Sequence, residues 1–533
     1  MAPQKGKKSN EKSDCISAVT CQNHYYEKPE SKDNFLKFKK ELDVICTEAP
    51  LTLNRINKEF KEITIITFRK HQGFKAKEDK LILAVEKKPC KKYNKQFQNE
   101  DDAKKTKKET AYDYFIETGL YAGEIVYGGV RFSITPDCNQ LLYKTMLRRA
   151  NHIYIDKKES GAAIDQDNNF LLIQYLFLSL LQKISVMGLP QEYSVQRYHD
   201  LKVHGGLDVK NYVIKDIPFK GKIYSKKNER KYVQSIVDVL YTALALCQKE
   251  VEKNFSRLSL LKQELKVNFS GRRPTFQTIQ FAKKHRVLNN PMFSEYQRAL
   301  EYAEIIIQNG SLLPDESNKG KAFGYLLDVA SLWEVYLEYL MQQSLSNWRI
   351  EAQEELNLYQ DCFFARQNYP DFVLRKKGEE NKVAILDAKF KRMGFVNGDV
   401  DRADLHQIHS YAGYYREKGD TVVLCSLIYP LSKKISKKDL SKNWGGLYGI
   451  QKPDEAKTKF VIDGVYKGKK IVEKENQNED SIKTSTDEDE ESNSYKNEEV
   501  DVKNYDVAAA ETAFINRIKK LLGEPVEESK MFD

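Results

Sequence analysis

The chain has 533 residues, of which 41% are apolar and 31% charged. This length exceeds one ordinary domain and the apolar share excludes a wholly disordered chain, so we expect three or four folded units of about 100 to 200 residues. The net charge of +10 conceals a segregation, because residues 471–506 hold 13 acids and four bases, which leaves +19 on the rest of the chain. That distribution is typical of a body that binds a polyanion and carries an acidic segment.

The cysteines and the most apolar segment indicate the cellular compartment in which the chain is expected. Eight cysteines are scattered without a CxxC pair or a Cys/His cluster at zinc-finger spacing, which favours reduced thiols and a cytoplasmic setting. The N-terminus is basic, but no apolar core follows it, so no secretory signal is predicted. Residues 170–187 are strongly apolar, yet four polar residues interrupt them, and we expect a buried helix here and no membrane association.

The N-terminal third mixes helix and strand patterns. Residues 1–32 are polar and predict a disordered tail, and 33–150 predict an α+β domain. Within that domain the sequence predicts a helix starting at 33 or 34, strands over 62–68 and 81–86, and a helix over 137–151. The lysine-rich residues 87–108 predict a solvated loop or a phosphate-binding segment. Gly128 and Gly129 separate two alternating runs, the pattern of a tight hairpin turn.

The middle of the chain, 151–315, predicts a mainly helical region. Besides 170–187, helices are expected over 229–252, 255–267, 274–285 and 292–309. A strand-and-turn region contains HGGLD at 204–208, where Asp208 is a candidate cap. The short polar segment 315–320 marks the expected domain boundary.

After residue 320 the pattern predicts an α/β layer arrangement over 316–470. A long amphipathic helix is expected over 321–345, followed by strands over 361–366, 371–375 and 382–389, a helix over 402–417 and a strand over 421–429. The acidic low-complexity insert 471–507 predicts a disordered loop, or a segment that competes with DNA for the basic surface. Residues 508–533 predict a docked C-terminal helix and a tail.

The residues that point to chemistry lie in this α/β unit. Tyr369-Pro370-Asp371 opens one strand, and the apolar run VAIL delivers Asp387 and Lys389 to one face of the next. Two carboxylates on neighbouring strands can bind a hard cation such as Mg²⁺. An adjacent ammonium group can orient a water molecule and offset charge on an attacked phosphate. This combination serves phosphodiester hydrolysis.

The DxK motif alone is weak evidence, because about 13 acid-x-base triplets are expected by chance in a chain with 77 acids and 87 bases. The context strengthens the hypothesis. Glu334 lies on the preceding predicted helix, and the following helix places Gln407 and Tyr411 on one face, with Asp404 as a weaker candidate. The plainer alternative is a surface strand with an ion pair and a helix with polar decoration.

This arrangement resembles the PD-(D/E)xK nuclease superfamily, and the wider sequence is similar to the McrC-type nuclease subunit of modification-dependent (5-methylcytosine) restriction systems. The resemblance rests on LWEVYL (332–337), YPDFVL (369–374), ILDAKFK (385–391) and DLHQIHSYA (404–412), with weaker similarity over much of 60–430. It implies a restriction-endonuclease-like α/β domain over 316–470 and a partner-binding role for 33–150.

The resemblance also implies residue roles. Asp371 and Asp387 would be metal ligands, Lys389 the catalytic lysine, and Glu334 a further acidic ligand, direct or through water. Gln407 would position the DNA backbone or the lysine, with Tyr411 as its helix neighbour. The implied cofactor is Mg²⁺, with Mn²⁺ as a substitute.

The implied function is a Mg²⁺-dependent DNA endonuclease subunit of an antiviral type IV restriction system. It would act on double-stranded, modified DNA together with an AAA+ GTPase of the McrB type, in an oligomeric assembly. The chain has no GxxxxGK[ST] loop of its own, so the nucleotide chemistry would belong to that partner. Two alternatives stay open: a non-catalytic DNA-binding or GTPase-stimulating adaptor with this fold, and a repair or recombination nuclease without a GTPase partner.

Overall fold

The structure is a computed structural model. It describes residues 16–20, 38–60, 63–69, 79–89, 112–150, 169–219, 221–248, 252, 255–309, 322–359, 362–363, 365–395, 400–436, 444–447, 457–468 and 505–526. The chain divides into two compact units, the first formed by Met1–His152 with Glu316–Asp533 and the second by Ile153–Asp315. Most of the lysine-rich stretch 87–108, nearly all of the acidic insert 471–507 and the expected boundary at 315–320 lie outside the described residues.

The first unit begins with two sheets that share a core. The five-stranded N-terminal sheet has the order β1 (Ile16–Val19), β7 (Val130–Thr135), β6 (Tyr121–Tyr127), β11 (Phe323–Asp328) and β3 (Ile63–Ile66). A three-stranded sheet contains β2 (Leu51–Thr52), β4 (Leu81–Pro89) and β5 (Tyr112–Thr118). Three helices accompany them: α2 (Lys39–Ile45), α3 (Leu53–Glu59) and α4 (Gln140–Ala150).

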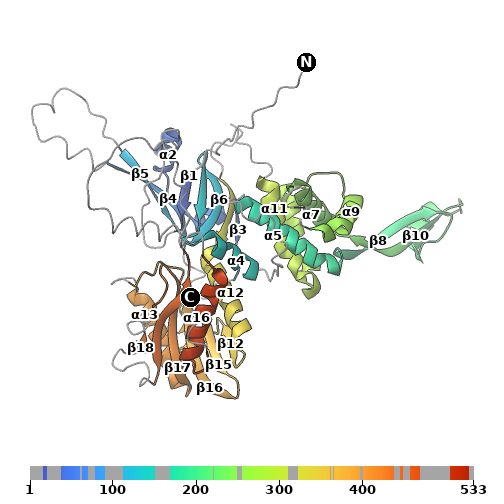
Figure 1. Cartoon of the computed structure of the whole chain (residues 1–533). Helices are drawn as coiled ribbons and strands as arrows, with labels where there is room; N and C mark the ends of the chain where they lie inside the picture. The colour runs from blue at the N-terminus through green and yellow to red at the C-terminus, as the bar shows by residue number, and fades with distance from the viewer. Residues whose placement is uncertain are drawn as a thin grey trace, which may run out of the picture. The chain divides into compact units, whose positions relative to one another are not determined.

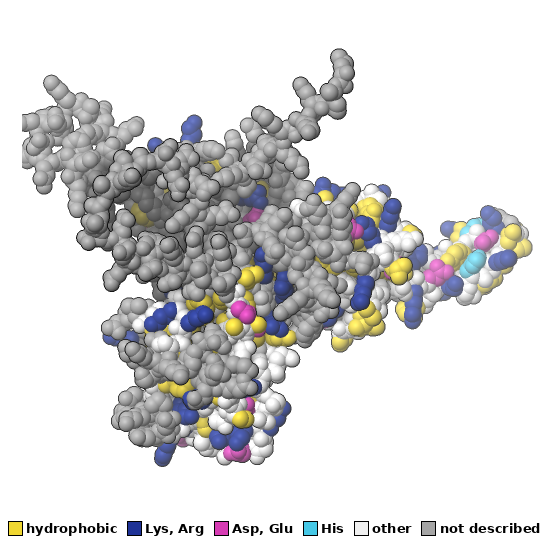
Figure 2. Space-filling view, viewed as in Figure 1, with side chains coloured by type: hydrophobic (Ala, Val, Ile, Leu, Met, Phe, Trp, Pro, Cys, Tyr) yellow, Lys and Arg dark blue, Asp and Glu magenta, His cyan; other side chains and the backbone are white. Residues whose placement is uncertain are grey.

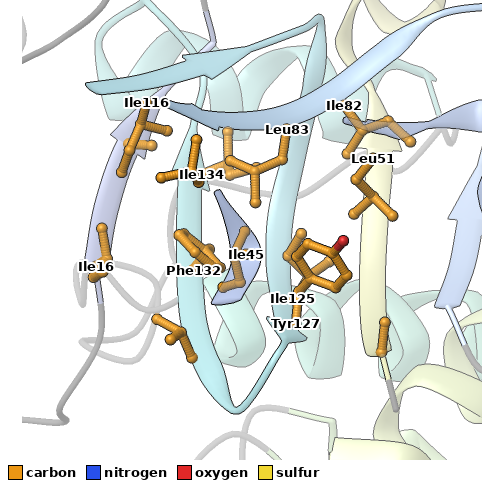
Figure 3. Packing of buried hydrophobic residues seen from close by; sticks show 14 of the residues in the cluster. Ile16, Ile45, Leu51, Ile82, Leu83, Ile116, Ile125, Tyr127, Phe132 and Ile134 are labelled. Atoms are coloured by element: carbon orange, nitrogen blue, oxygen red, sulfur yellow. The ribbon is translucent and has the colours of Figure 1, made fainter. Parts of the chain in front are cut away.

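The core between these sheets consists of apolar side chains. Phe132 and Ile134 from β7 and Ile125 from β6 face Leu83 of the smaller sheet, and Ile45 of α2 lies among them (Figure 3). All five are buried. Alternate residues along β7 are buried and more exposed, as expected for a strand with one face on a core. The hairpin prediction is confirmed, because Gly128 and Gly129 adopt φ of 58° and 83° between β6 and β7.

Two predictions for this region are corrected. Part of the expected N-terminal tail is strand β1, which pairs in parallel with β7 and buries Ile16 and Ala18. The expected long helix over 321–345 begins eight residues late, because residues 323–328 form β11 between β6 and β3. All six residues of β11 are buried. A strand covered on both faces reads as a continuous apolar run, which the sequence pattern does not separate from the helix that follows.

The C-terminal sheet of the first unit has six strands. Their order is β12 (Trp348–Ala352), β15 (Phe372–Lys376), β16 (Glu379–Ala388), β17 (Thr421–Leu431), β19 (Lys459–Tyr466) and β18 (Trp444–Gly446). Strands β16, β17 and β19 are parallel to one another, and β12, β15 and β18 add antiparallel edges. A small ribbon pairs β13 (Leu356–Leu358) with β14 (Arg366–Asn368). The helices are α12 (Val329–Ser344), α13 (Arg402–Glu417) and α16 (Val507–Leu521).

Helices cover both faces of this sheet. Ile408 and Tyr411 of α13 share a core with Val383 and Ile385, the odd-numbered residues of β16. The opposite face holds α16, whose Arg517 bonds to Asp463 of β19 at 3.0 Å, and α12 contacts α16 there (Figure 1). The predicted helix over 402–417 and the docking of the C-terminal helix are confirmed.

The second unit combines helices with a projecting arm. Its helices are α5 (Asn169–Ile184), α6 (Val209–Lys215), α7 (Gln234–Leu246), α9 (Ser259–Asn268), α10 (Phe276–Lys283) and α11 (Ser294–Asn309), with short 3-10 turns η5 (Ser185–Met187), η6 (Ser256–Leu258), η7 (Arg286–Asn289) and η8 (Pro291–Phe293). The arm pairs β8 (Gln191–Asp200) with β10 (Ile223–Tyr232) and carries β9 (Gly206–Leu207). It extends away from the helices of its own unit and exposes apolar, basic and histidine side chains (Figures 1 and 2).

The arm corrects one further prediction. Residues 229–232, expected in a helix, complete β10, and α7 starts only at Gln234. Asp208, expected to cap a tight turn, instead caps the helix α6, where it accepts a hydrogen bond from the backbone N–H of Asn211. The several sheets and packed helices together confirm a mixed α/β, multidomain fold class.

No helix in the described part of the chain is long and apolar enough to cross a membrane.

Candidate active site

Two aspartates lie side by side at one end of the C-terminal sheet. Phe372 of β15 pairs with Leu386 of β16, and the same antiparallel register brings Asp371 opposite Asp387. The backbone N–H of Ala388 donates to Oδ2 of Asp371 at 2.8 Å, which fixes that carboxylate against the neighbouring strand. Both aspartates have 0% exposure. Burial of a carboxylate costs free energy unless a positive charge or hydrogen bonds compensate it. This position is therefore typical of a functional site and not of polar side chains on the surface of a sheet.

Lys389 supplies a positive charge next to this pair. Its ammonium group forms an ion pair with Asp387 and donates to Oε1 of Gln407 at 3.1 Å. Its backbone N–H donates to the carbonyl of Ile428 at 2.9 Å, which continues the pairing of β16 with β17. The side chain is therefore aimed by the strand and kept in place by α13.

A chain of hydrogen bonds runs from Lys389 back to the start of β15. The side-chain N–H of Gln407 donates to the hydroxyl of Tyr411 at 2.6 Å. That hydroxyl donates to the carbonyl of Tyr369 at 3.2 Å, two residues before Asp371. The i, i+4 spacing of Gln407 and Tyr411 on α13 places both side chains on one face, as predicted. One helix thus orients the lysine and fixes the segment that carries the first aspartate.

Asp404, the weaker candidate, is engaged with a different lysine. Its Oδ2 accepts a hydrogen bond from Lys391 at 2.8 Å, whereas the ammonium of Lys389 lies 4.0 Å from its Oδ1. Tyr429 donates to the same carboxylate at 3.4 Å. Burial, together with the negative charges of Asp404 and Asp387, raises the pKa of Tyr429. Asp404 therefore adjoins the lysine and forms a second ion pair with Lys391, whose role the sequence did not suggest.

Glu334 is buried on α12 and contacts two residues that sequence reasoning missed. The side chain of Gln353 donates to its Oε2 at 3.2 Å, and Nη1 of Arg69 lies 3.6 Å from the same oxygen. Gln353 also donates its backbone N–H to the carbonyl of Asp371 at 3.1 Å. Its φ of 50° is unusual for a residue with a side chain, and such conformations gather at functional sites. Gln353 therefore ties Glu334 to the first aspartate.

The donor chemistry of Asp371 and Asp387 fits a hard divalent cation. Carboxylate oxygens are the ligands that Mg²⁺ and Mn²⁺ prefer, and each carboxylate accepts several bonds at once. Among the residues that the structure describes, no three Asp, Glu, His or Cys side chains gather closely enough to hold a metal ion. The site is therefore a pair of carboxylates with a lysine, and Glu334 as a ligand stays a prediction.

Fold and site together define a multidomain α/β protein with two buried aspartates and a lysine at the end of a mixed sheet. The family model described as "McrBC 5-methylcytosine restriction system component" matches residues 105–430, more than half of the chain. The chain belongs to this family. The predicted resemblance to a component of 5-methylcytosine restriction systems is confirmed.

Two solved structures from Thermococcus gammatolerans are similar to the chain. A half-complex of McrB AAA+ hexamers with bound McrC has 15% identity and a TM-score of 0.41, covering 70% of this chain and 86% of that one. The McrBC complex has 16% identity and a TM-score of 0.33, covering 62% of this chain and 89% of that one. A comparison with curated proteins finds no match.

Proposed function

We propose that the chain is the McrC-type, Mg²⁺-dependent endonuclease subunit of a modification-dependent restriction system, with a PD-(D/E)xK active site in its C-terminal sheet. The observation that carries the proposal is the placement of Asp371, Asp387 and Lys389 side by side in burial at one sheet end. Membership of the McrBC family supports the substrate class, DNA that carries 5-methylcytosine. The AAA+ GTPase partner is implied by the sequence resemblance to McrC-type subunits.

Asp371 and Asp387 would hold the cation, which is Mg²⁺ in this proposal, with Mn²⁺ as a substitute. When bound, such an ion polarises a phosphate oxygen and lowers the pKa of a bound water. Lys389 orients the attacking water and offsets the negative charge that develops on the phosphate. Its ion pair with Asp387 and its hydrogen bond to Gln407 keep the ammonium group at the sheet end.

Burial strengthens these interactions. The low-dielectric surroundings of Asp387 and Lys389 make each electrostatic interaction stronger than it would be in water. Because strands and a helix hold the groups, they need little rearrangement when charge develops. Gln407 and Tyr411 act through the lysine and through the start of β15, so they are positioning residues in this proposal.

The test compares Asp387→Asn and Lys389→Met with the wild-type chain in a cleavage assay on methylated and unmodified DNA. The assay includes Mg²⁺, GTP and the candidate partner, each also omitted in turn. Each substitution should lower cleavage by at least about 10³-fold, because it removes a group that acts on the transition state. Lys382→Met is the matched control, since Lys382 lies in the same strand with a partly exposed side chain paired to Glu379.

Circular dichroism and binding to the partner should be unchanged in all three variants. Cleavage retained by both site variants would contradict the site assignment. Absence of cleavage by the wild-type chain under every condition, with stimulation of GTP hydrolysis preserved, would favour the adaptor function.

A further inference from the structure

One arginine reaches the candidate active site from the other sheet of the first unit. Arg69 lies three residues beyond the end of β3, in the N-terminal sheet. Its side chain is only 12% exposed, and its two terminal nitrogens address two glutamates of α12. Nη1 lies 3.6 Å from Oε2 of Glu334, and Nη2 forms an ion pair with Glu338. The guanidinium is therefore part of the surroundings of a predicted metal ligand.

The same guanidinium also interacts electrostatically with Asp371, the first aspartate of the pair. Its central carbon lies 5.7 Å from the ring centroid of Phe372, the residue that follows Asp371. Burial lowers the pKa of Arg69, and the negative charges of Glu334 and Asp371 act in the opposite direction. Arginine stays protonated in proteins, so a permanent positive charge faces two of the three carboxylates expected to serve a cation.

The backbone around Arg69 is attached to the helix that carries Glu334. The N–H of Phe68 donates to the hydroxyl of Ser331 on α12 at 3.1 Å. That hydroxyl donates to the carbonyl of Asp328, the residue that caps the helix. Arg69 is consequently held at this position by both its backbone neighbour and its side chain.

A guanidinium and a divalent cation compete for the same carboxylates. Both are attracted to Glu334 and Asp371, and they repel each other at short range in a poorly solvated site. Arg69 is paired with Glu334, and among the described residues Glu334 does not form a three-acid cluster with the aspartate pair.

We propose that Arg69 is a built-in competitor of the divalent cation, so that the N-terminal sheet sets the metal affinity of the nuclease site. The inference rests on the proposed function, because it assumes that Asp371 and Asp387 hold the cation. A ligand that binds more tightly when Arg69 is moved away from Glu334 would raise the affinity for the metal. The size of the change equals the ratio of the ligand's affinities for the two positions of Arg69, paired with Glu334 and moved away from it. The sheet that Arg69 follows thereby becomes a control element for the site.

The experiment measures binding of Mn²⁺ alone to the full-length chain by isothermal titration calorimetry, with the Mn²⁺-induced rise in Tm as a second readout. Arg69→Gln removes the charge and keeps a hydrogen-bonding side chain. It should tighten the Kd for Mn²⁺ at least about 5-fold, the lower end of typical coupling between sites, and enlarge the rise in Tm. Arg131→Gln is the matched control, because Arg131 pairs with a glutamate of the same sheet, Glu124. It should bind Mn²⁺ like wild type.

The variant Asp387→Asn distinguishes failure of the proposed metal site from failure of the competitor role of Arg69. If Asp387→Asn binds Mn²⁺ as wild type does, the metal site of the proposed function is wrong. If it loses binding while Arg69→Gln binds with unchanged or weaker affinity, the metal site stands and the competitor role of Arg69 is overturned.

A second variant keeps the proposal testable if Arg69→Gln does not fold. Glu338→Gln removes the negative charge of the second glutamate that pairs with Arg69. The guanidinium of Arg69 should then pair more strongly with Glu334. The affinity for Mn²⁺ should then fall at least about 2-fold, within the range expected for a surface-to-site coupling. Unchanged or tighter binding by a folded Glu338→Gln protein would overturn the proposal.

Discussion

The two large sheets of the first unit are built differently. The cluster between the N-terminal sheet and its smaller neighbour consists of apolar and aromatic side chains. The C-terminal sheet has a comparable apolar layer under α13, but the ends of β15 and β16 also bury Asp371, Asp387 and Lys389. An apolar pair of similar volume would be at least as stable at such a place.

This difference distinguishes residues that stabilise the fold from residues that the proposed function requires. The N-terminal core gains free energy from every side chain it removes from water. The buried charges of Asp371, Asp387 and Lys389 should contribute little to stability, and the proposed function explains them by the chemistry that they would perform. Substitutions in the first region should therefore act on folding, and substitutions in the second on activity.

The largest expected effect on stability is at Phe132, fully buried in β7. Phe132→Ala should lower the free energy of unfolding by about 4 kcal/mol, because it removes apolar contacts and leaves a cavity. Phe132→Leu, the control, should cost about 1 kcal/mol. Urea unfolding followed by circular dichroism measures both values. Equal effects of the two substitutions would show that this core is loosely packed and would break the comparison.

The join between the two regions should show a smaller, pH-dependent effect. Asp137 accepts hydrogen bonds from Lys467 at 2.8 Å and Arg392 at 2.9 Å. Burial alone would raise the pKa of Asp137, but these two cations outweigh it and hold the pKa below the ordinary value of 3.8. Its stabilisation is therefore fully present above the pKa of the unfolded chain and is lost as the pH falls through the lower folded-state pKa.

Asp137→Asn should accordingly lower the free energy of unfolding by about 2 kcal/mol at neutral pH, the typical contribution of hydrogen bonds to charged groups. The gap between the two proteins should close as the pH falls below 3.8. Urea unfolding at a series of pH values checks this. A gap that stays constant into acid would mean that packing, not charge, carries the effect of the substitution.

The smallest expected stability effect is at Tyr411, and it should come with a loss of activity. Tyr411→Phe removes the hydroxyl that links Gln407 to the carbonyl of Tyr369. We expect a cost of about 1 kcal/mol in stability and about a tenfold loss of DNA cleavage, with the Kd for Mn²⁺ unchanged. Tyr414→Phe on the same helix is the control and should leave cleavage unchanged. Stability loss without any loss of cleavage would assign Tyr411 to the core instead of the site.

Much of the C-terminal sheet could be predicted from the sequence because its signals are local. Helix α13 has the predicted bounds, since Asp401 caps it and its apolar residues recur at helical spacing. Asp387 and Lys389 follow an apolar run at strand spacing, and the register of β15 and β16 does bring Asp371 opposite Asp387. Gln407 and Tyr411 share a face because they are four residues apart.

The missed features depend on contacts between distant segments. Arg69 contacts Glu334 across more than two hundred residues, and only the fold brings them together. Gln353 gave no local signal either, because its φ of 50° is imposed by its surroundings in the folded chain. Strand β11 was missed for a different reason: both of its faces are covered, so all six of its residues are buried and no alternation survives in the sequence.

The position of β11 decides how the chain can be divided. A fragment that starts at 316, the sequence-based boundary, carries away an interior strand of the N-terminal sheet. The fragment that remains then presents two new unpaired edges, on β6 and on β3, and exposed edges of this kind promote aggregation. Excision of 153–315, which forms the second unit by itself, leaves every strand of both sheets with its partners. The chain is best dissected by removing its middle, not by cutting it in two.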